Sequence, residues 1–354
     1  MTNILKRKAK GLMSEVCTAS VAAAIAVSAQ SAHAARKSAP PLVGFKTVSV
    51  TSSLDGKAQT CRFYAPKKPA GKVPLLVALH TWSYGWKADD PARWALGECK
   101  RRGWALIYPD FRGPNWTPAA CGSDLAVRDI VDAVAYAKAH APVDEKRVYL
   151  IGASGGGMMA LLMAARAPEL WAGVYAGCPI SDLARWHGDS RRLRTAYWKH
   201  LEKACGGAPD VRRDEYARRS PLTYITAAKK VPLQIATGIH DGHTGSVPIG
   251  HAIRAFNALA EKEAVVSEAD IAFMERQEKV PDALRFTGRD PFFSEKMRIH
   301  LRRTSGSVRL TVFEGGHAGN FAAGIDWLAR QRLGSPVDWT LPATGRGVES
   351  RATR

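Results

Sequence analysis

The chain has 354 residues, of which 46% are hydrophobic and 23% charged, so it can bury a sizeable core and lacks the composition of disordered or collagen-like chains. Lysine and arginine outnumber aspartate and glutamate by 51 to 32, which gives a formal net charge of +19. The basic residues are spread along the chain without a nucleic-acid-binding motif, so we expect no nucleic-acid partner.

The first 34 residues are expected to be a signal peptide. The basic run KRKAK at 6–10 precedes an alanine- and valine-rich stretch at 16–27, and Ala-His-Ala at 32–34 offers a cleavage site after Ala34. The mature protein is therefore expected in the periplasm or the medium. No other stretch approaches the roughly 20 apolar residues of a membrane span, so none is expected in the mature chain. Residues 35–45 are expected to form a flexible leader.

Regular alternation of apolar runs and amphipathic segments begins at residue 46. Two strands are expected around a turn at Asp55-Gly56, and each later apolar run is followed by a helical pattern. Continuously apolar strands that alternate with helices indicate an α/β fold, a mostly parallel doubly wound sheet with helices on both faces. The later strands are expected at 73–80, 104–110, 147–152, 171–178, 231–238 and 308–316, and helices at 90–103, 123–141, 247–262 and 322–333.

This α/β domain is expected to span residues 46–332. The alternation lapses at 180–228, which is charged, rich in tryptophan and helical in pattern, and we expect a small lid-like insertion there. Residues 263–306 are polar with helical patches and are expected to be a surface excursion. Residues 333–354 are expected to be a C-terminal tail.

Four glycines stand around Ser154, in the segment GASGGG at 152–157, where a strand must become a helix. One explanation is purely structural, because glycines allow a sharp turn or the close packing of two backbones. The spacing also matches G-x-S-x-G, the nucleophile elbow that exposes a serine hydroxyl above the end of a sheet. Ser154 is therefore the candidate nucleophile.

Asp241 and His317 follow two later strands of the same expected sheet. The carboxyl ends of parallel strands share one edge of a sheet, so these residues are expected beside Ser154. Their order along the chain, Ser, Asp, His, is the one that accompanies the elbow. In a catalytic triad the histidine takes the serine proton and the aspartate orients the imidazole. Backbone N–H groups of Gly155 and of Thr81 or Trp82 are expected to hold the oxyanion.

At these residues the chain resembles the α/β-hydrolase fold, in its prolyl-oligopeptidase-like branch, and within it exported bacterial carbohydrate and feruloyl-type esterases. The resemblance rests on the elbow, on GIHDGHTGSVP around Asp241 and on FEGGH around His317, and it covers roughly residues 45–332. It implies Ser154 as nucleophile, Asp241 as acid and His317 as base, with no cofactor. Two features depart from the pattern: HTWS replaces the HGG of many relatives, and the acid loop is longer, which leaves a histidine on each side of the aspartate.

The expected reaction is hydrolysis of carboxylic esters through an acyl-enzyme, with acetyl or feruloyl esters of carbohydrates as substrates. The large peptidases of this branch carry a β-propeller ahead of the hydrolase domain, and none is expected here. Aromatic rings stack on sugar and phenolic rings, so tryptophans are candidates for substrate contact. The alternatives are that these tryptophans belong to the core and that Arg112 forms a structural ion pair. The residues expected near the substrate are Trp82, Arg112, Trp116, Trp186 and His243.

Two other functions remain open at this point. One is a serine peptidase of the prolyl-oligopeptidase type, and the other is a non-catalytic protein that binds a glycan or a polyanion on a hydrolase scaffold. The complete triad argues against the second. The partner is expected to be a small-molecule or polysaccharide ester, and the oligomeric state stays open.

Five cysteines follow residue 34, so at least one thiol stays unpaired within a monomer. Cys178 and Cys205 are expected to form a disulfide that ties the lid to the rim, with Cys99 and Cys121 as the competing pair. The chain has no C-x-x-C and no cysteine–histidine cluster with zinc spacing, so no metal site is expected.

Overall fold

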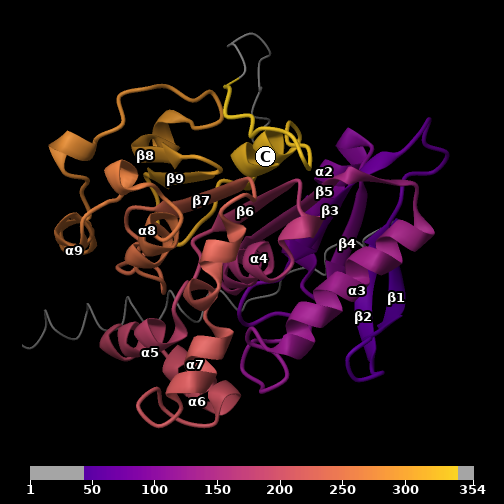
Figure 1. Ribbon diagram of the computed structural model, residues 1–354, viewed down its shortest axis with the longest axis horizontal. Helices are drawn as coiled ribbons and strands as arrows, with labels where there is room; N and C mark the ends of the chain where they lie inside the picture. The colour runs from indigo at the N-terminus through magenta and orange to yellow at the C-terminus, as the bar shows by residue number, and fades with distance from the viewer. Residues whose placement is uncertain (1–43, 342–354) are drawn as a thin grey trace, which may run out of the picture. The chain divides into compact units, whose positions relative to one another are not determined.

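The computed structural model describes residues 44–341; the expected signal peptide, most of the leader and the end of the tail lie outside the described residues. Nine strands form one sheet in the order β1-β2-β4-β3-β5-β6-β7-β9-β8 (Figure 1). The strands are β1 Lys46–Thr51, β2 Ala58–Tyr64, β3 Val73–Leu79, β4 Ala105–Pro109, β5 Val143–Ala153, β6 Gly173–Gly177, β7 Leu233–Gly238, β8 Ile299–Ser305 and β9 Val308–Phe313.

The centre of the sheet is parallel and its two edges are antiparallel. β4, β3, β5, β6, β7 and β9 run in one direction, whereas β2 pairs antiparallel with both β1 and β4, and β8 pairs antiparallel with β9. Every residue of β3, β4, β6, β7 and β9 is buried, as expected for parallel strands that are covered on both faces. The prediction of a mostly parallel α/β sheet is confirmed.

Helices cover both faces of this sheet. Successive side chains of a strand point to opposite faces, so a strand that is apolar along its whole length needs cover on both. Val174 and Ala176 of β6 join the core that contains α3 and α4, whereas Tyr175 packs against Gly324 of α10. The helices are α2 Asp89–Arg102, α3 Asp124–His140, α4 Gly155–Arg166, α5 Leu183–Arg192, α6 Tyr197–Cys205, α7 Arg213–Arg219, α8 Gly250–Asn257, α9 Glu268–Gln277 and α10 Phe321–Leu328, with 3-10 turns at Pro168–Leu170, Pro221–Thr223, Ile225–Ala228, Lys262–Ala264, Asp282–Leu284 and Glu295–Met297.

One strand was not expected from the sequence. β8 lies inside the polar segment 263–306, for which helical patches alone were expected, and that segment also holds α9. β8 is an edge strand with β9 as its partner and carries Arg302 and Arg303. Charged side chains protect an edge strand from pairing with other chains, and they also erase the apolar pattern that marks a strand.

The insertion at 180–228 is helical, as expected, and gathers α5, α6 and α7 in the lower part of Figure 1. A buried arginine anchors it to the loop ahead of α3. Arg219, only 2% exposed, donates to the carbonyl oxygens of Pro118 and Ala120 at 2.8 Å and of Cys121 at 3.2 Å, and pairs with Glu215.

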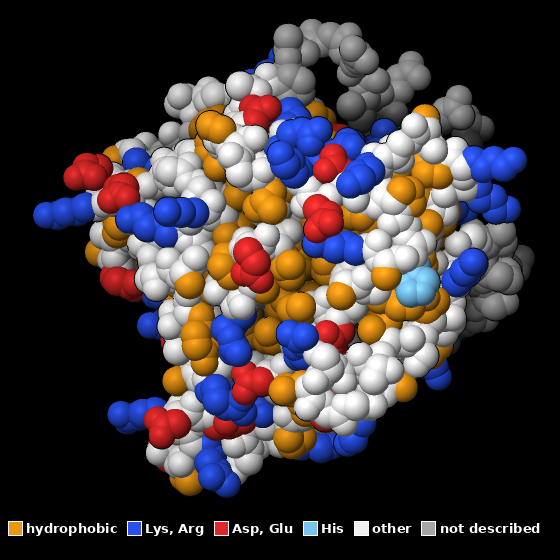
Figure 2. Space-filling model, turned by 45° about the vertical axis from the view of Figure 1, so that its right-hand side comes forward, with side chains coloured by type: hydrophobic (Ala, Val, Ile, Leu, Met, Phe, Trp, Pro, Cys, Tyr) orange, Lys and Arg blue, Asp and Glu red, His pale blue; other side chains and the backbone are white. Residues whose placement is uncertain are grey.

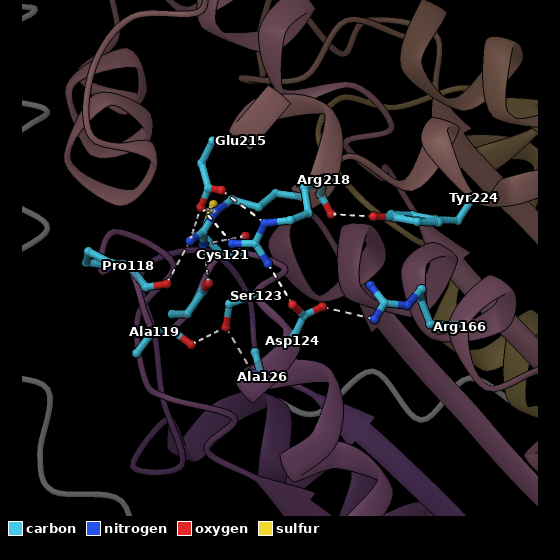
Figure 3. Close-up of polar contacts among 12 residues, drawn as sticks. Pro118, Ala119, Cys121, Ser123, Asp124, Ala126, Arg166, Glu215, Arg218 and Tyr224 are labelled. Carbon is cyan, nitrogen blue, oxygen red and sulfur yellow. Dashed lines mark hydrogen bonds and ion pairs between the residues drawn. The ribbon is translucent and has the colours of Figure 1, made fainter. Parts of the chain in front are cut away.

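A second arginine extends this anchor across the start of α3 (Figure 3). Arg218 binds Asp124 at 2.8 Å, and Asp124 binds Arg166 of α4 at 2.9 Å. Ser123 caps α3, because its hydroxyl accepts from the N–H of Ala126. The insertion is therefore held against the same helices that cover the sheet.

The expected disulfide between Cys178 and Cys205 is wrong, because all five cysteines from Cys61 onward are free thiols. The competing pair, Cys99 and Cys121, is likewise unbonded. The thiol of Cys178 interacts with His317. Cys205 lies on α6 and is close enough to Cys121 to affect the pKa of that thiol. Burial raises the pKa of the Cys205 thiol to about 12, so it stays protonated.

The surface mixes charges of both signs. Figure 2 shows lysine and arginine scattered among acidic side chains over the face in view, with hydrophobic side chains exposed between them. The basic net charge is therefore not gathered into one patch on this face. Within residues 44–341, no helix combines the length and apolar character that crossing a membrane requires.

Candidate active site

Ser154 stands on a sharp turn between β5 and α4. Its backbone has φ 57° and ψ −122°, a conformation that side-chain-bearing residues rarely adopt, and its N–H donates to the carbonyl oxygen of Gly177 at 2.9 Å. A Cβ atom at Gly152 would lie 2.3 Å from the carbonyl oxygen of Gly156, so the strand and the helix approach too closely for any other residue. The glycines thus serve the turn, and the turn leaves Ser154 half-buried at the end of the sheet.

Asp241 and His317 form a hydrogen-bonded pair at the same edge of the sheet. The Nδ1 atom of His317 lies 2.7 Å from Oδ2 of Asp241, and the other carboxylate oxygen accepts from the N–H of Val247 at 3.1 Å. Asp241 is 2% exposed, whereas the side chain of His317 is 24% exposed. A buried carboxylate thus fixes the orientation of a partly accessible imidazole.

The histidine loop lies against the strand next to Ser154. A Cβ atom at Gly177, at the end of β6, would lie 3.2 Å from Cα of Gly319, two residues after His317. Gly177 is also the residue that accepts the N–H of Ser154. The structure therefore brings the loops of Ser154, Asp241 and His317 to one edge, at the carboxyl ends of β5, β7 and β9.

The imidazole of His317 is biased toward its protonated form. Burial lowers its pKa, but the hydrogen bonds to Asp241 and to the thiol of Cys178 outweigh burial and raise the pKa of His317 well above its ordinary value of 6.5. Once unprotonated, a histidine with a raised pKa is a stronger base and holds firmly a proton that it receives from a neighbouring hydroxyl.

The backbone of Trp82 lies beside the residue that follows Ser154. A Cβ atom at Gly155 would lie 2.6 Å from the backbone nitrogen of Trp82, so that glycine leaves room for the close approach. Of the two expected donors, Trp82 is thus the one next to Gly155, while the carbonyl oxygen of Thr81 lies 2.9 Å from the Nδ1 atom of His80. The backbones of Gly155 and Trp82 therefore lie next to each other.

The indoles of Trp82 and Trp186 do not line an open rim, contrary to expectation. They are 2% and 1% exposed, and their ring centroids lie 4.6 Å apart. Tyr197 stacks on Trp186, and the Nε1 atom of Trp82 donates to Nδ1 of His200 at 3.2 Å. Both indoles belong to a buried aromatic contact between the lid and the loop after β3. Of the expected aromatic residues Trp116 stays half-buried, 4.9 Å from the ring of His200.

Arg112 and His243 also have other partners. The guanidinium of Arg112 binds Asp129 at 2.5 Å and Asp55 at 2.8 Å, so it completes a structural ion pair and has no free face for a substrate. His243 is exposed, and its Nε2 atom lies 2.6 Å from the carbonyl oxygen of Glu275, at the end of α9. The side chain thus faces α9, which the sequence pattern around Asp241 did not reveal.

A histidine–glutamate network joins the acid loop to the histidine loop. His240 lies 2.7 Å from both Glu278 and Glu314, and His300 lies 2.9 Å from Glu314. Burial lowers the pKa of His240, but the two glutamates outweigh it and raise the pKa overall. This network lines a cavity of about 500 Å³ together with Lys279, Val280, Arg285, Phe286, Arg298 and Ile299.

Two residues that contact predicted site residues, Cys178 at His317 and His200 at Trp82, were not predicted from the sequence. Cys178 directly follows β6, so the rule that selected Asp241 and His317, a polar residue after a strand, also applies to it. The sequence analysis assigned Cys178 to a disulfide instead, so it was not predicted as a site residue. His200 lies in the lid, 118 residues from Trp82, and nothing in the sequence links the two.

Residues 96–276 match the model of the prolyl oligopeptidase family, which is about half of the chain. The matched segment contains Ser154 and Asp241, whereas His317 follows it.

Curated relatives match shorter segments. The chain is 34% identical over 140 residues to feruloyl esterase B of Neurospora crassa, and 31% identical over 135 residues to acetylxylan esterase A of Aspergillus ficuum. It is 30% identical over 131 residues to poly(3-hydroxyalkanoate) depolymerase C of Paucimonas lemoignei. These matches cover 33% to 34% of this chain and 30% to 44% of the relatives' own lengths.

Among solved structures, the chain is similar to an acylaminoacyl peptidase in complex with a peptide chloromethyl ketone, with a TM-score of 0.54 at 16% identity. The match covers 82% of this chain and 42% of that one. The acylaminoacyl peptidase of Pyrococcus horikoshii gives a TM-score of 0.55 at 15% identity, over 86% of this chain and 43% of that one. At this identity the likeness concerns the fold, which is that of the α/β hydrolases.

Proposed function

The chain belongs to the prolyl oligopeptidase family of serine hydrolases, and on that premise we propose that it hydrolyses carboxylic esters through an acyl-enzyme on Ser154. The proposed substrates are acetyl or feruloyl esters of carbohydrates. The proposed catalytic residues are Ser154, Asp241 and His317, with the backbone N–H groups of Gly155 and Trp82 as oxyanion donors.

In this mechanism the Oγ atom of Ser154 attacks the ester carbonyl carbon while His317 takes the hydroxyl proton. Asp241 holds Nδ1 of His317 at 2.7 Å, which leaves the other ring nitrogen to exchange the proton and stabilises the imidazolium. The imidazolium then gives the proton to the departing alcohol. Water, activated by the same imidazole, releases the acid and restores Ser154.

The observation that carries this proposal is the Asp241–His317 hydrogen bond at the carboxyl ends of β7 and β9, together with a serine in the elbow conformation at the end of β5 in the same sheet. The closeness of the Trp82 nitrogen to Gly155 supports it further, because backbone donors fixed before the reaction stabilise the oxyanion without reorganisation. Removal of one such donor from a related hydrolase mechanism typically lowers kcat by about 100-fold or more.

We favour ester hydrolysis over peptide hydrolysis as the proposed reaction because of the names of the curated relatives. Two of them, a feruloyl esterase and an acetylxylan esterase, have names that specify ester hydrolysis. A peptidase of the prolyl oligopeptidase type is the second candidate, which the family match favours. An amide has a poorer leaving group than an ester, so it depends more strongly on proton donation by His317.

The test compares kcat/KM on acetylated xylan oligomers, methyl ferulate and a proline-containing peptide amide. We expect both esters to be cleaved with a higher kcat/KM than the peptide amide, and Ser154→Ala to lower the ester rates by about a thousandfold or more. The highest kcat/KM on the peptide amide would replace the esterase proposal with the peptidase one. Ester turnover that Ser154→Ala leaves unchanged would remove the mechanism altogether.

A further inference from the structure

Three chemically different donor groups meet at the edge of the sheet. Cys178 follows β6, Asp241 follows β7 and His317 follows β9, and these strands are consecutive neighbours. The thiol sulfur, one carboxylate oxygen and one imidazole nitrogen all lie within 4.8 Å of one another. Residues 139 positions apart in the chain thus form one cluster, which no local cysteine–histidine spacing could indicate.

The distances are close to those of a metal site. Zinc binds sulfur at about 2.3 Å and nitrogen or oxygen at about 2.0 to 2.2 Å in a tetrahedral arrangement. Ligand atoms around such an ion therefore lie about 3.3 to 3.8 Å apart. The hydrogen-bonded atoms of Asp241 and His317 at 2.7 Å need to separate slightly, and the sulfur needs to approach by at most about 1.5 Å.

The backbone holds the thiol of Cys178 in place. The N–H of Cys178 donates to the carbonyl oxygen of Ala236 in β7 at 2.7 Å, and its φ of 34° turns the chain sharply out of the sheet. Cys178 is 2% exposed, but the side chain of His317 is 24% exposed, so an ion has access from the imidazole side.

The other cysteines lack such surroundings. Burial raises the pKa of the thiols of Cys61, Cys99, Cys121 and Cys205, and none of the four belongs to a comparable cluster among residues 44–341. Cys178, by contrast, lies in one cluster with Asp241 and His317, and a cysteine sulfur together with a carboxylate oxygen and an imidazole nitrogen is a ligand set that zinc accepts.

We propose that Cys178, Asp241 and His317 form a binding site for a thiophilic divalent cation of the zinc class, and that its occupation inhibits the enzyme. On binding, Cys178 releases its thiol proton to solvent and its sulfur bonds the ion, while the protonated imidazole of His317 releases one ring proton to solvent and binds through the nitrogen lone pair that this frees. If Nδ1 binds, Nε2 carries the remaining ring proton, and if Nε2 binds, its lone pair is used. In either case His317 can no longer accept the proton of Ser154; the inhibition, unlike the binding, rests on the proposed function.

The binding test measures Zn²⁺ affinity by competition with a chromophoric chelator and follows Co²⁺ by its sulfur-to-metal charge-transfer absorption. The proteins are the full chain, Cys178→Ala, Cys178→Ser, and Cys99→Ala as a control that removes a buried thiol of α2 outside the cluster. We expect one ion per chain, the charge-transfer band in the wild type and in Cys99→Ala, and an affinity about 100-fold lower with no band in both Cys178 variants.

Ser154→Ala separates this inference from the proposed function, because it should bind the ion with wild-type affinity although it hydrolyses no ester. In the wild type, Zn²⁺ should inhibit ester hydrolysis at the concentration at which it binds, and a chelator should restore the rate. Zn²⁺ affinity that survives loss of Cys178, or that disappears with His300→Ala instead, would place the ion at the His240–Glu314 network and overturn the proposal. Saturating binding at the cluster without inhibition would overturn its inhibitory part.

Discussion

Gly245 leaves the space in which the Asp241–His317 pair forms. A Cβ atom there would lie 2.3 Å from Oδ1 of Asp241 and 2.5 Å from Cβ of His317. Neither neighbour can move freely, because Asp241 is buried and holds both the imidazole and the N–H of Val247. Gly245 belongs to the loop that carries Asp241, and its approach to both members of the pair could not be predicted from the sequence.

We predict that Gly245→Ala lowers kcat for ester hydrolysis by about 100-fold, since displacing a reacting group by about 1 Å has an effect of that size. The matched control is Gly97→Ala in α2, where a Cβ atom would meet nothing within 4 Å. That variant should keep the wild-type kcat. A Gly245→Ala enzyme with unchanged kcat would mean that the pair tolerates displacement and is not the catalytic base.

The raised pKa of His317 predicts an alkaline shift of the activity profile. A base works only when it is unprotonated, so kcat/KM should increase with pH through a pKa above the ordinary 6.5. Asp241→Asn removes the carboxylate that raises this pKa, and it should move the acid limb to lower pH while lowering kcat by about 10,000-fold. An acid limb at or below pH 6.5 in the wild type would contradict the assignment.

The same shift makes a contribution to stability with the opposite dependence on pH. A histidine whose pKa is raised on folding stabilises the folded state fully below its unfolded pKa, and this stabilisation is lost as pH increases through the folded pKa. The contribution of His317 to the free energy of unfolding should therefore decrease over the pH range in which activity increases. Denaturant titrations of the wild type and His317→Gln at several pH values measure it.

At the scale of elements, apolar continuity made the central strands predictable. β3, β4, β6, β7 and β9 are buried along their whole length, and each lies within a strand expected from the sequence. β8 was missed because an edge strand with charged side chains lacks that continuity.

The arrangement of the lid could not be predicted either. The indoles of Trp82 and Trp186 are in contact although 104 positions separate them, and a sequence alone gives no reason to prefer that contact to an exposed rim. The candidate triad could be predicted from the sequence because each of its members follows an apolar strand. Cys178 follows a strand by the same rule, whereas His200 could be found only from the tertiary structure, because no strand precedes it directly and its partner Trp82 is distant in the chain.

Arg219 should be the main anchor of the lid. Its guanidinium is buried with three backbone carbonyl oxygens and Glu215 as partners, so Arg219→Ala leaves these carbonyl oxygens without their donor and removes one partner of the half-buried Glu215 carboxylate. We predict a loss of about 3 kcal/mol in the free energy of unfolding. Arg218→Ala, which removes a half-exposed partner of Asp124, should lower it by less than about 1 kcal/mol. Equal losses in denaturant titrations would show that burial does not distinguish the two.

At the scale of the whole molecule, one topological fact organises the site. The parallel strands end at a common edge, so loops distant in the chain converge there without any shared local motif. The family match and the likeness in fold to acylaminoacyl peptidases agree with this architecture. The loops around that edge differ from the sheet in being poorly predictable from the sequence.

Export remains a prediction for the whole chain. The basic, apolar and small-residue order of the first 34 residues predicts cleavage after Ala34. N-terminal sequencing of protein recovered from the periplasm or the medium should give Ala35 as the first residue. Recovery of the exported protein with Met1 intact would contradict cleavage.

The central claim is that Ser154 is the nucleophile, and covalent labelling tests it most directly. A fluorophosphonate reacts with a serine that an adjacent base has activated, and intact-mass and peptide mass spectrometry locate the adduct. We predict one adduct per chain, on Ser154, that is absent from Ser154→Ala and much slower to form in His317→Ala. A chain that stays unlabelled, or an adduct on another residue that persists in Ser154→Ala, would contradict the account.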